Sequence, residues 1–313
     1  MNTTSLSPYV VETAGLTKRF GDRTVVRNVE LRVPRGAAFG YLGPNGAGKT
    51  TLIRMLLGLT PASAGTMALL GLPVPKQRAA ALARVGAIVE EPKFHGHLTG
   101  RENLRVVAAA RSREARGRID AVLERVGLAA RADERVRTYS LGMRQRLGLA
   151  RCLLADPELL ILDEPMNGLD PAGIQEFRGF VRSFVDGGGT IVLSSHLLDE
   201  VEKTCDHVAI VDRGAVVAQG SIAELRGADG TSVLVEVDER ARARTLLAAE
   251  RTVDSVVDDG TLLRVALREG IDAVPDLNRR LVEAGFAVRR LEPQQASLED
   301  RFLKITTRLE NAA

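Results

Sequence analysis

The clearest chemical pattern in the sequence is a glycine-rich stretch followed by a lysine and two threonines. It matches the G-x-x-x-x-G-K-[ST] pattern. Backbone N–H groups of such a loop surround phosphate oxygens, the lysine reaches the terminal phosphates and the first threonine can ligate Mg²⁺. The predicted nucleotide-binding residues are Gly43, Pro44, Asn45, Gly46, Ala47, Gly48, Lys49, Thr50 and Thr51. The alternative, a simple glycine-rich turn, would not require Lys49 and Thr50 at the start of a helix.

A pair of carboxylates follows a short apolar run further along the chain. Residues 159–162 are all Leu or Ile, and Asp163 and Glu164 come directly after them. Ligands of α/β sheets bind at the carboxyl ends of the strands. We therefore expect Asp163 to hold Mg²⁺ and Glu164 to take a proton from a water molecule that attacks phosphate. The alternative is a solvated acidic turn at the end of a strand.

Three further motifs surround the carboxylate pair in the sequence. Residues 139–146 read YSLGMRQR, and Ser140 stands where a helix would be capped. Helix capping alone is the alternative to a functional role for this serine. Residues 167–170 read NGLD, and residues 194–196 read SSH. Each of these motifs is a weak signal alone, and a single histidine such as His196 is the weakest.

Apolar runs and helical patterns indicate how these motifs are positioned. Runs of strand length occur at 37–43, 85–90, 159–163, 190–195 and 207–212. Helical patterns occur at 51–57, 101–110, 116–126 and 142–154. Over residues 10–226 this alternation predicts an α/β domain with a largely parallel sheet and a helical subdomain at about 99–155.

The pattern changes after residue 226. Strand and helix signals follow in the order βαββαβ, which predicts a small α+β, ferredoxin-like C-terminal domain over 227–313, with a closing helix at 297–307. Residues 1–9 are expected to be a short N-terminal tail. Only one phosphate loop is present, so the sequence encodes one nucleotide-binding core.

Composition narrows the class of protein. Charged residues make up 27% of the chain and hydrophobic residues 45%, which favours a folded globular protein. The net charge is only +3 and no basic segment is interleaved with aromatics, so no nucleic-acid partner is predicted. The most apolar segment, 147–162, is interrupted by charged residues, and no secretion signal is expected. Cys152 and Cys205 are predicted to be reduced, buried thiols of the cytosol.

In this order and spacing, the five motifs resemble those of the nucleotide-binding domain of ABC transporters, over roughly residues 10–226. The resemblance implies ATP and Mg²⁺ as cofactors and a P-loop ABC ATPase fold, with a mixed sheet and a helical subdomain. Phe20 resembles the aromatic residue that stacks on adenine, although core packing is the alternative. Ser140 and Gly142 resemble the signature residues that contact the γ-phosphate. The implied catalytic residues are Lys49, Glu164 and His196.

The same resemblance implies partners. In this family the phosphate loop of one subunit faces the signature of another, with Asp170 at the junction, so a chain with one copy of each must pair. We expect a second ATP-binding subunit, in a homodimer, and separate polytopic membrane permease subunits. The expected location is the cytoplasmic face of the membrane, peripheral through that partner. Residues 93–98 are the candidate surface for docking the permease, whereas a metal site at His95 and His97 is the weaker alternative to a solvated loop.

Two departures from the family pattern narrow the resemblance. Glu90 stands where a glutamine is usual, and it is expected to approach Mg²⁺ and water while adding negative charge. Leu141 and Met143 replace the usual Gly and Gln of the signature. With residues 98–104 and 291–302, these features resemble exporter ATPases of the daunorubicin and bacitracin type, which implies drug, antibiotic or lipid-like cargo. The alternatives are a soluble ABC ATPase with a non-transport role and a P-loop kinase.

Overall fold

The computed structural model describes residues 7–227, 231–268 and 270–295, and the chain divides into two compact units, Met1–Gly220 and Ser221–Ala313. Each unit is described by itself. The boundary expected at 226/227 coincides with the end of helix α9 (Ile222–Gly227), slightly beyond this division. The predicted closing helix at 297–307 lies outside the described residues, as does most of the predicted N-terminal tail.

The first unit contains a six-stranded sheet in the order β10-β9-β3-β8-β7-β6. Its strands are β3 (Ala38–Leu42), β6 (Val85–Ile88), β7 (Leu159–Leu162), β8 (Thr190–Ser195), β9 (His207–Asp212) and β10 (Ala215–Ser221). The five strands from β9 to β6 pair in parallel. Every residue of β3, β7 and β8 is buried, which explains why these strands are continuous apolar runs in the sequence. The predicted parallel sheet is confirmed.

A second, antiparallel sheet was not expected from the sequence. It has the order β2-β1-β4-β5 and comprises β1 (Tyr9–Phe20), β2 (Arg23–Pro34), β4 (Ala64–Leu69) and β5 (Leu72–Val74). Exposed residues alternate with buried ones along much of β2, because one face of this sheet is solvated. The other face shares a core with the parallel sheet, in which Val11 and Leu31 belong to the same cluster as Phe39 and Ile161.

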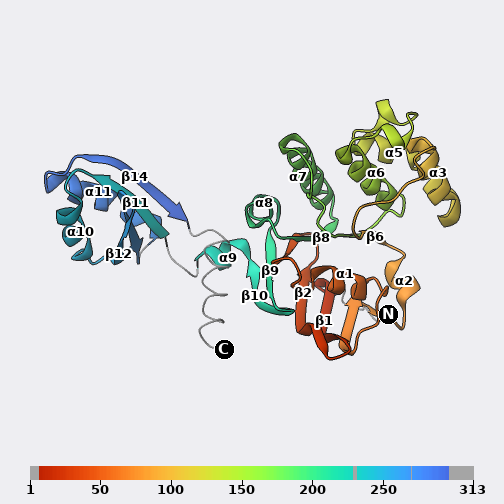
Figure 1. Ribbon diagram of the computed structural model, residues 1–313, viewed down its shortest axis with the longest axis horizontal. Coiled ribbons are helices and arrows are strands. Elements are labelled where there is room, and N and C mark those ends of the chain that lie inside the picture. The colour runs from red at the N-terminus through yellow and green to blue at the C-terminus, as the bar shows by residue number, and fades with distance from the viewer. Residues whose placement is uncertain (1–6, 228–230, 269, 296–313) are drawn as a thin grey trace, which may run out of the picture. The chain divides into compact units, whose positions relative to one another are not determined.

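Helices of the first unit connect and cover the strands. They are α1 (Lys49–Leu56), α2 (Arg78–Leu82), α3 (Gly100–Arg111), α4 (Arg113–Gly117), α5 (Ile119–Arg125), α6 (Leu141–Leu153), α7 (Pro171–Asp186) and α8 (Leu198–Thr204). The predicted helical insertion is present between β6 and β7, and Figure 1 shows α3, α5 and α6 grouped to one side of the sheets. The single helix predicted at 116–126 is instead two, since Gly117 ends α4 and α5 begins at Ile119.

The second unit has the predicted βαββαβ order. Its elements are β11 (Thr231–Val237), α10 (Arg240–Ala248), β12 (Val253–Asp259), β13 (Leu262–Leu267), α11 (Val274–Glu283) and β14 (Val288–Gln295). The antiparallel sheet, in the order β12-β13-β11-β14, packs against the two helices. Val233 and Val265 of the sheet share a core with Leu247 of α10 and Leu281 of α11. The described members of this core all lie between 233 and 291, within the second unit.

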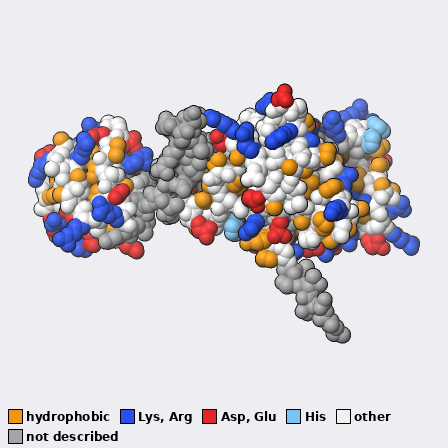
Figure 2. All heavy atoms as spheres, turned by 90° about the horizontal axis from the view of Figure 1, so that it is seen from below, with side chains coloured by type: hydrophobic (Ala, Val, Ile, Leu, Met, Phe, Trp, Pro, Cys, Tyr) orange, Lys and Arg blue, Asp and Glu red, His pale blue; other side chains and the backbone are white. Residues whose placement is uncertain are grey.

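Several simpler expectations can be compared with the structure. None of the helices in the described ranges is both long and apolar enough to cross a membrane. Cys152 and Cys205 are free and buried, as predicted. Burial raises the pKa of the Cys152 thiol to about 11, and it raises the pKa of Cys205 as well. On the face seen in Figure 2, basic and acidic side chains are interspersed.

Candidate active site

The phosphate loop connects β3 to α1, and two of its glycines are required by close contacts. A Cβ atom at Gly43 would lie 2.4 Å from the carbonyl oxygen of Val211, and one at Gly48 would lie 2.6 Å from that of Val25. Gly48 also has a φ of 96°, a conformation that favours glycine. A Cβ at Gly46 would meet no atom within 4 Å, so the loop is open on that side.

Lys49 is the first residue of α1 and only 5% of it is exposed. Its Nζ donates to the carbonyl oxygen of Gly43 at 2.7 Å and to that of Pro44 at 3.2 Å. Thr50 and Thr51 follow it and are partly exposed. The first turn of α1 has no acidic residue, so the positive end of the helix dipole is free to attract an anion. The loop and helix therefore form a cradle suited to phosphate.

One hydroxyl group positions both predicted carboxylates after β7. The Ser194 hydroxyl donates to Oδ1 of Asp163 at 2.5 Å, and its oxygen accepts the backbone N–H of Glu164 at 2.9 Å. Asp163 is 4% exposed, and its N–H donates to the carbonyl oxygen of Ile88 at 2.9 Å. Ser194 was assigned no function from the sequence. The only signal was its place in the SSH motif, on the strand that pairs with β7.

Glu164 connects the phosphate loop to His196, the third predicted catalytic residue. Its Oε1 lies 3.1 Å from Nζ of Lys49, and its Oε2 lies 3.0 Å from Nδ1 of His196. Glu164 has a φ of 47°, and residues in this strained region concentrate at active sites. The three side chains follow β3, β7 and β8, which are parallel neighbours in the sheet. The structure thus brings Lys49, Glu164 and His196 together.

Glu90 takes a different position from the one expected for a magnesium ligand. It has a φ of 62°, it is 64% exposed, and its carboxylate pairs with Arg54 of α1. Within the described ranges it forms no hydrogen bond or ion pair with Asp163 or Glu164. The next residue, Glu91, pairs instead with Arg144 of α6 at 3.3 Å. Two adjacent acids therefore connect to two different helices.

The signature residues lie at the start of α6 and pack on the turn at 167–170. Ser140 is exposed and caps the helix, its Oγ accepting the N–H of Met143 at 3.2 Å. A Cβ at Gly168 would lie 2.6 Å from Leu141 Cδ2, and one at Gly142 would lie 3.7 Å from Leu169 Cδ2. In the described part of the chain, no hydrogen bond or ion pair joins Ser140 or Gly142 to the phosphate loop.

Asp170 and Phe20 are the last two predicted site residues. Asp170 caps α7, and its Oδ1 accepts the N–H of Gly173 at 2.9 Å. Phe20 ends β1 and is 53% exposed, with Nζ of Lys18 at 4.8 Å from the ring centroid. Phe20 is therefore not a core residue, and its ring is accessible for stacking.

His95 and His97 have ring centroids 5.9 Å apart, and the described residues contain no cluster of three or more metal-ligating side chains.

The parallel sheet, the glycine loop before α1 and the carboxylates after β7 define a P-loop ATPase. The ABC transporter family model matches residues 26–167. The chain is 38% identical over 299 residues to the bacitracin transport ATP-binding protein BcrA of Enterococcus faecalis, covering 95% of this chain and 96% of the relative. It is also 38% identical to the daunorubicin resistance ATP-binding protein DrrA3 of Streptomyces coeruleorubidus, over 93% of this chain and 94% of the relative.

A solved structure described as an ATP-binding subunit of an ABC transporter superposes with a TM-score of 0.63 and 30% identity, covering 69% of this chain and 92% of that chain. The chain belongs to the ABC transporter ATP-binding proteins. The predicted family, fold class and ATPase activity coupled to transport are thereby confirmed. Proteins of this family act as paired subunits together with membrane permeases.

Proposed function

We propose that this chain drives an exporter of drug, antibiotic or lipid-like cargo as a homodimer at the cytoplasmic face of the membrane. The observation that supports pairing is the division of the predicted site into two groups. Lys49, Glu164 and His196 form one group, and Ser140 and Gly142 lie on α6 without a bond to it. A second copy would supply the missing signature to each phosphate loop.

The residues of the first group have distinct proposed roles. Lys49 and the loop N–H groups bind the phosphates, while Glu164 takes the proton of the attacking water and His196 orients it. Mg²⁺ prefers oxygen ligands, and the Thr50 hydroxyl and the buried Asp163 carboxylate offer them. Mg²⁺ would neutralise charge on the phosphates during hydrolysis.

A subunit-mixing experiment tests the pairing. Lys49→Ala disables the phosphate loop. Gly142→Asp places a carboxylate where the γ-phosphate is expected, and the structure accommodates a side chain there because a Cβ would meet its nearest neighbour at 3.7 Å. Each variant alone should release little phosphate. Mixed in equal amounts, they should regain about a quarter of the wild-type rate, since half the dimers then have one intact site.

The matched control is Lys49→Ala mixed with the double variant Lys49→Ala/Gly142→Asp. This mixture contains no intact site in any dimer, and it should remain inactive. If the first mixture stays as inactive as this control, the two motifs do not act across a homodimer.

The names of the two relatives support the proposed cargo class. Cells expressing this chain with its co-purifying polytopic membrane protein should tolerate more bacitracin or daunorubicin, and Glu164→Gln should abolish that tolerance.

Residues 93–98 are the proposed docking surface for the permease. Recovery of ribosomes or DNA instead of a membrane protein would contradict the exporter proposal and favour the soluble alternative.

A further inference from the structure

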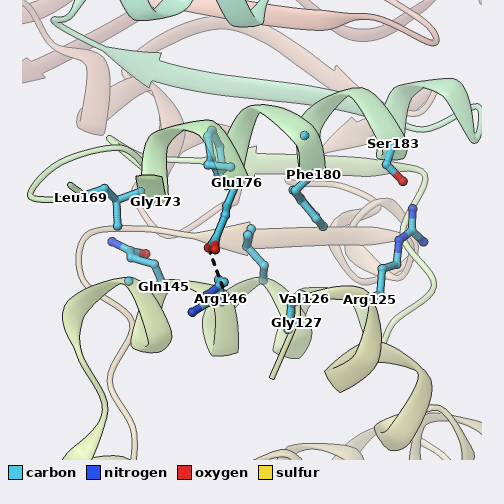
Figure 3. Close-up of a pocket in the computed structure, with 14 residues that line it drawn as sticks. Arg125, Val126, Gly127, Gln145, Arg146, Leu169, Gly173, Glu176, Phe180 and Ser183 are labelled. Carbon is cyan, nitrogen blue, oxygen red and sulfur yellow. Dashed lines mark ion pairs between the residues drawn. The ribbon is translucent and has the colours of Figure 1, made fainter. Parts of the chain in front are cut away.

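A cavity of about 360 Å³ lies between α5, α6 and α7 of the first unit. Figure 3 shows side chains of α7 on one side of it and residues 125–127 with α6 on the other. Its apolar walls include Val126, Leu149, Phe177 and Phe180. Neither the phosphate loop nor the Lys49, Glu164 and His196 group lines it. Its volume falls in the range of small-molecule sites, which are mostly apolar with a few polar groups.

The polar groups of this cavity favour an anion. Arg125 lies at one end of it, 5.6 Å from the ring centroid of Phe184, and has no ion pair among the residues that the structure describes. Arg146 pairs with Glu176 at 3.3 Å through Nη1, and its Nε is buried without a hydrogen-bond partner. Two guanidinium groups thus line the cavity, and one carboxylate neutralises only one of them.

We propose that this α5–α7 cavity binds a compact apolar anion, with an aromatic or aliphatic body and a single carboxylate or sulfonate. The body would displace water from the walls formed by Phe177 and Phe180. The anionic group would accept hydrogen bonds from the unpaired guanidinium of Arg125. Arg125 is exposed and also lines a second hollow of about 270 Å³, where Asp156 pairs with Arg118, so the anionic end remains close to solvent.

A molecule bound in the cavity would contact both elements that are predicted to face the second subunit, the signature and the turn at 167–170. Gly142 of the signature and Leu169 of the 167–170 turn both line it, and so does Gly173, whose N–H binds the capping Asp170. A molecule wedged between α6 and α7 would therefore act on the signature and on the turn together. This effect on ATP turnover rests on the proposed dimer, whereas binding itself does not.

Binding is tested without nucleotide by using two fluorescent probes that share one ring system. The probe 8-anilinonaphthalene-1-sulfonate carries the anion, and N-phenyl-1-naphthylamine lacks it. Gly179 of α7 lines the cavity, and a Cβ there would meet no atom within 4 Å, so we use Gly179→Phe to occupy the space beside it. We expect Gly179→Phe to weaken both probes by at least about tenfold. Gly179→Ala, the control, should bind both like the wild type. Unchanged binding of both probes to Gly179→Phe would overturn the site.

The charge requirement is tested by Arg125→Gln, with Arg116→Gln of α4 as the exposed control outside the cavity. We expect Arg125→Gln to weaken the sulfonate probe about tenfold and to leave the uncharged probe within about twofold. Equal binding of the sulfonate probe to wild type and Arg125→Gln would overturn the choice of an anion.

The sulfonate probe should also change the ATPase rate of the wild type but not of Gly179→Phe. An equal effect on both proteins would overturn the coupling while leaving the binding result intact.

Discussion

Lys49 and Glu164 form an ion pair, with Nζ 3.1 Å from Oε1, inside a site where these side chains are 5% and 19% exposed. The lysine expected to bind phosphate is thus paired with the carboxylate expected to activate water. An incoming triphosphate competes with Glu164 for Lys49, because it offers more negative charge to the same ammonium group. Glu164 would then remain with His196, 3.0 Å from its other oxygen.

Glu164→Gln should separate ATP binding from hydrolysis. The amide preserves the size of the side chain but cannot take a proton, so phosphate release should fall by at least about a hundredfold. ATP binding should persist, and size-exclusion chromatography with ATP should show an accumulated dimer. Normal hydrolysis by this variant would show that Glu164 is not the general base.

Lys49→Ala should weaken nucleotide binding by at least about tenfold, because the phosphates lose a charge-assisted hydrogen bond. The affinity is measured by titration with a fluorescent ATP analogue. Lys76→Ala is the matched control, since Lys76 is exposed and far from the loop in sequence. Equal weakening in both variants would point to a general loss of positive charge rather than to a specific contact of Lys49.

Glu90→Gln tests whether Glu90 leaves Arg54 to approach Mg²⁺ when ATP binds. If it does, the variant should need several times more Mg²⁺ for half-maximal ATPase activity, since an amide oxygen is a weaker ligand than a carboxylate. Arg54→Gln removes the same ion pair but keeps the carboxylate, so its Mg²⁺ requirement should not rise. The pair is 44% and 64% exposed, and either variant should lower the free energy of unfolding by less than about 1 kcal/mol. An unchanged Mg²⁺ requirement in Glu90→Gln would exclude the ligand role.

A truncated protein ending at Gly227 should fold and bind ATP. Among the described residues, the core that joins the two sheets of the first unit comes from residues before 217, and the second core comes from residues after 232. ATP affinity and the thermal unfolding midpoint of the first unit should therefore stay close to their full-length values. Loss of ATP binding on truncation would show that the first unit depends on the second.

The two thiols should be unreactive in the folded protein. Burial raises the pKa of Cys152 to about 11, so only about one thiol in a thousand is ionised at pH 8. Ellman's reagent should label neither cysteine until guanidinium unfolds the chain. Because the pKa is raised on folding, stability is unaffected below an ordinary thiol pKa of about 8.5 and falls as the pH rises above it. Rapid labelling at pH 8 without denaturant would contradict this burial.

Much of the parallel sheet could be predicted because its strands are buried on both faces and therefore form continuous apolar runs. The antiparallel sheet escaped prediction because β2 mixes exposed charged residues with its buried valines, and because β1 pairs with β4, which is distant in sequence. The phosphate loop was predictable from local glycine and lysine chemistry. The contacts of Ser194 and Arg54 were not, since they depend on side chains that meet only after the chain folds.

Among the described residues, each unit has a hydrophobic core of its own, and this separation determines where a core substitution acts. A substitution among Val233, Leu247 and Leu281 weakens a core whose described members all lie in the second unit. A core substitution in the second unit is therefore expected to lower the stability of that unit before it affects ATP binding.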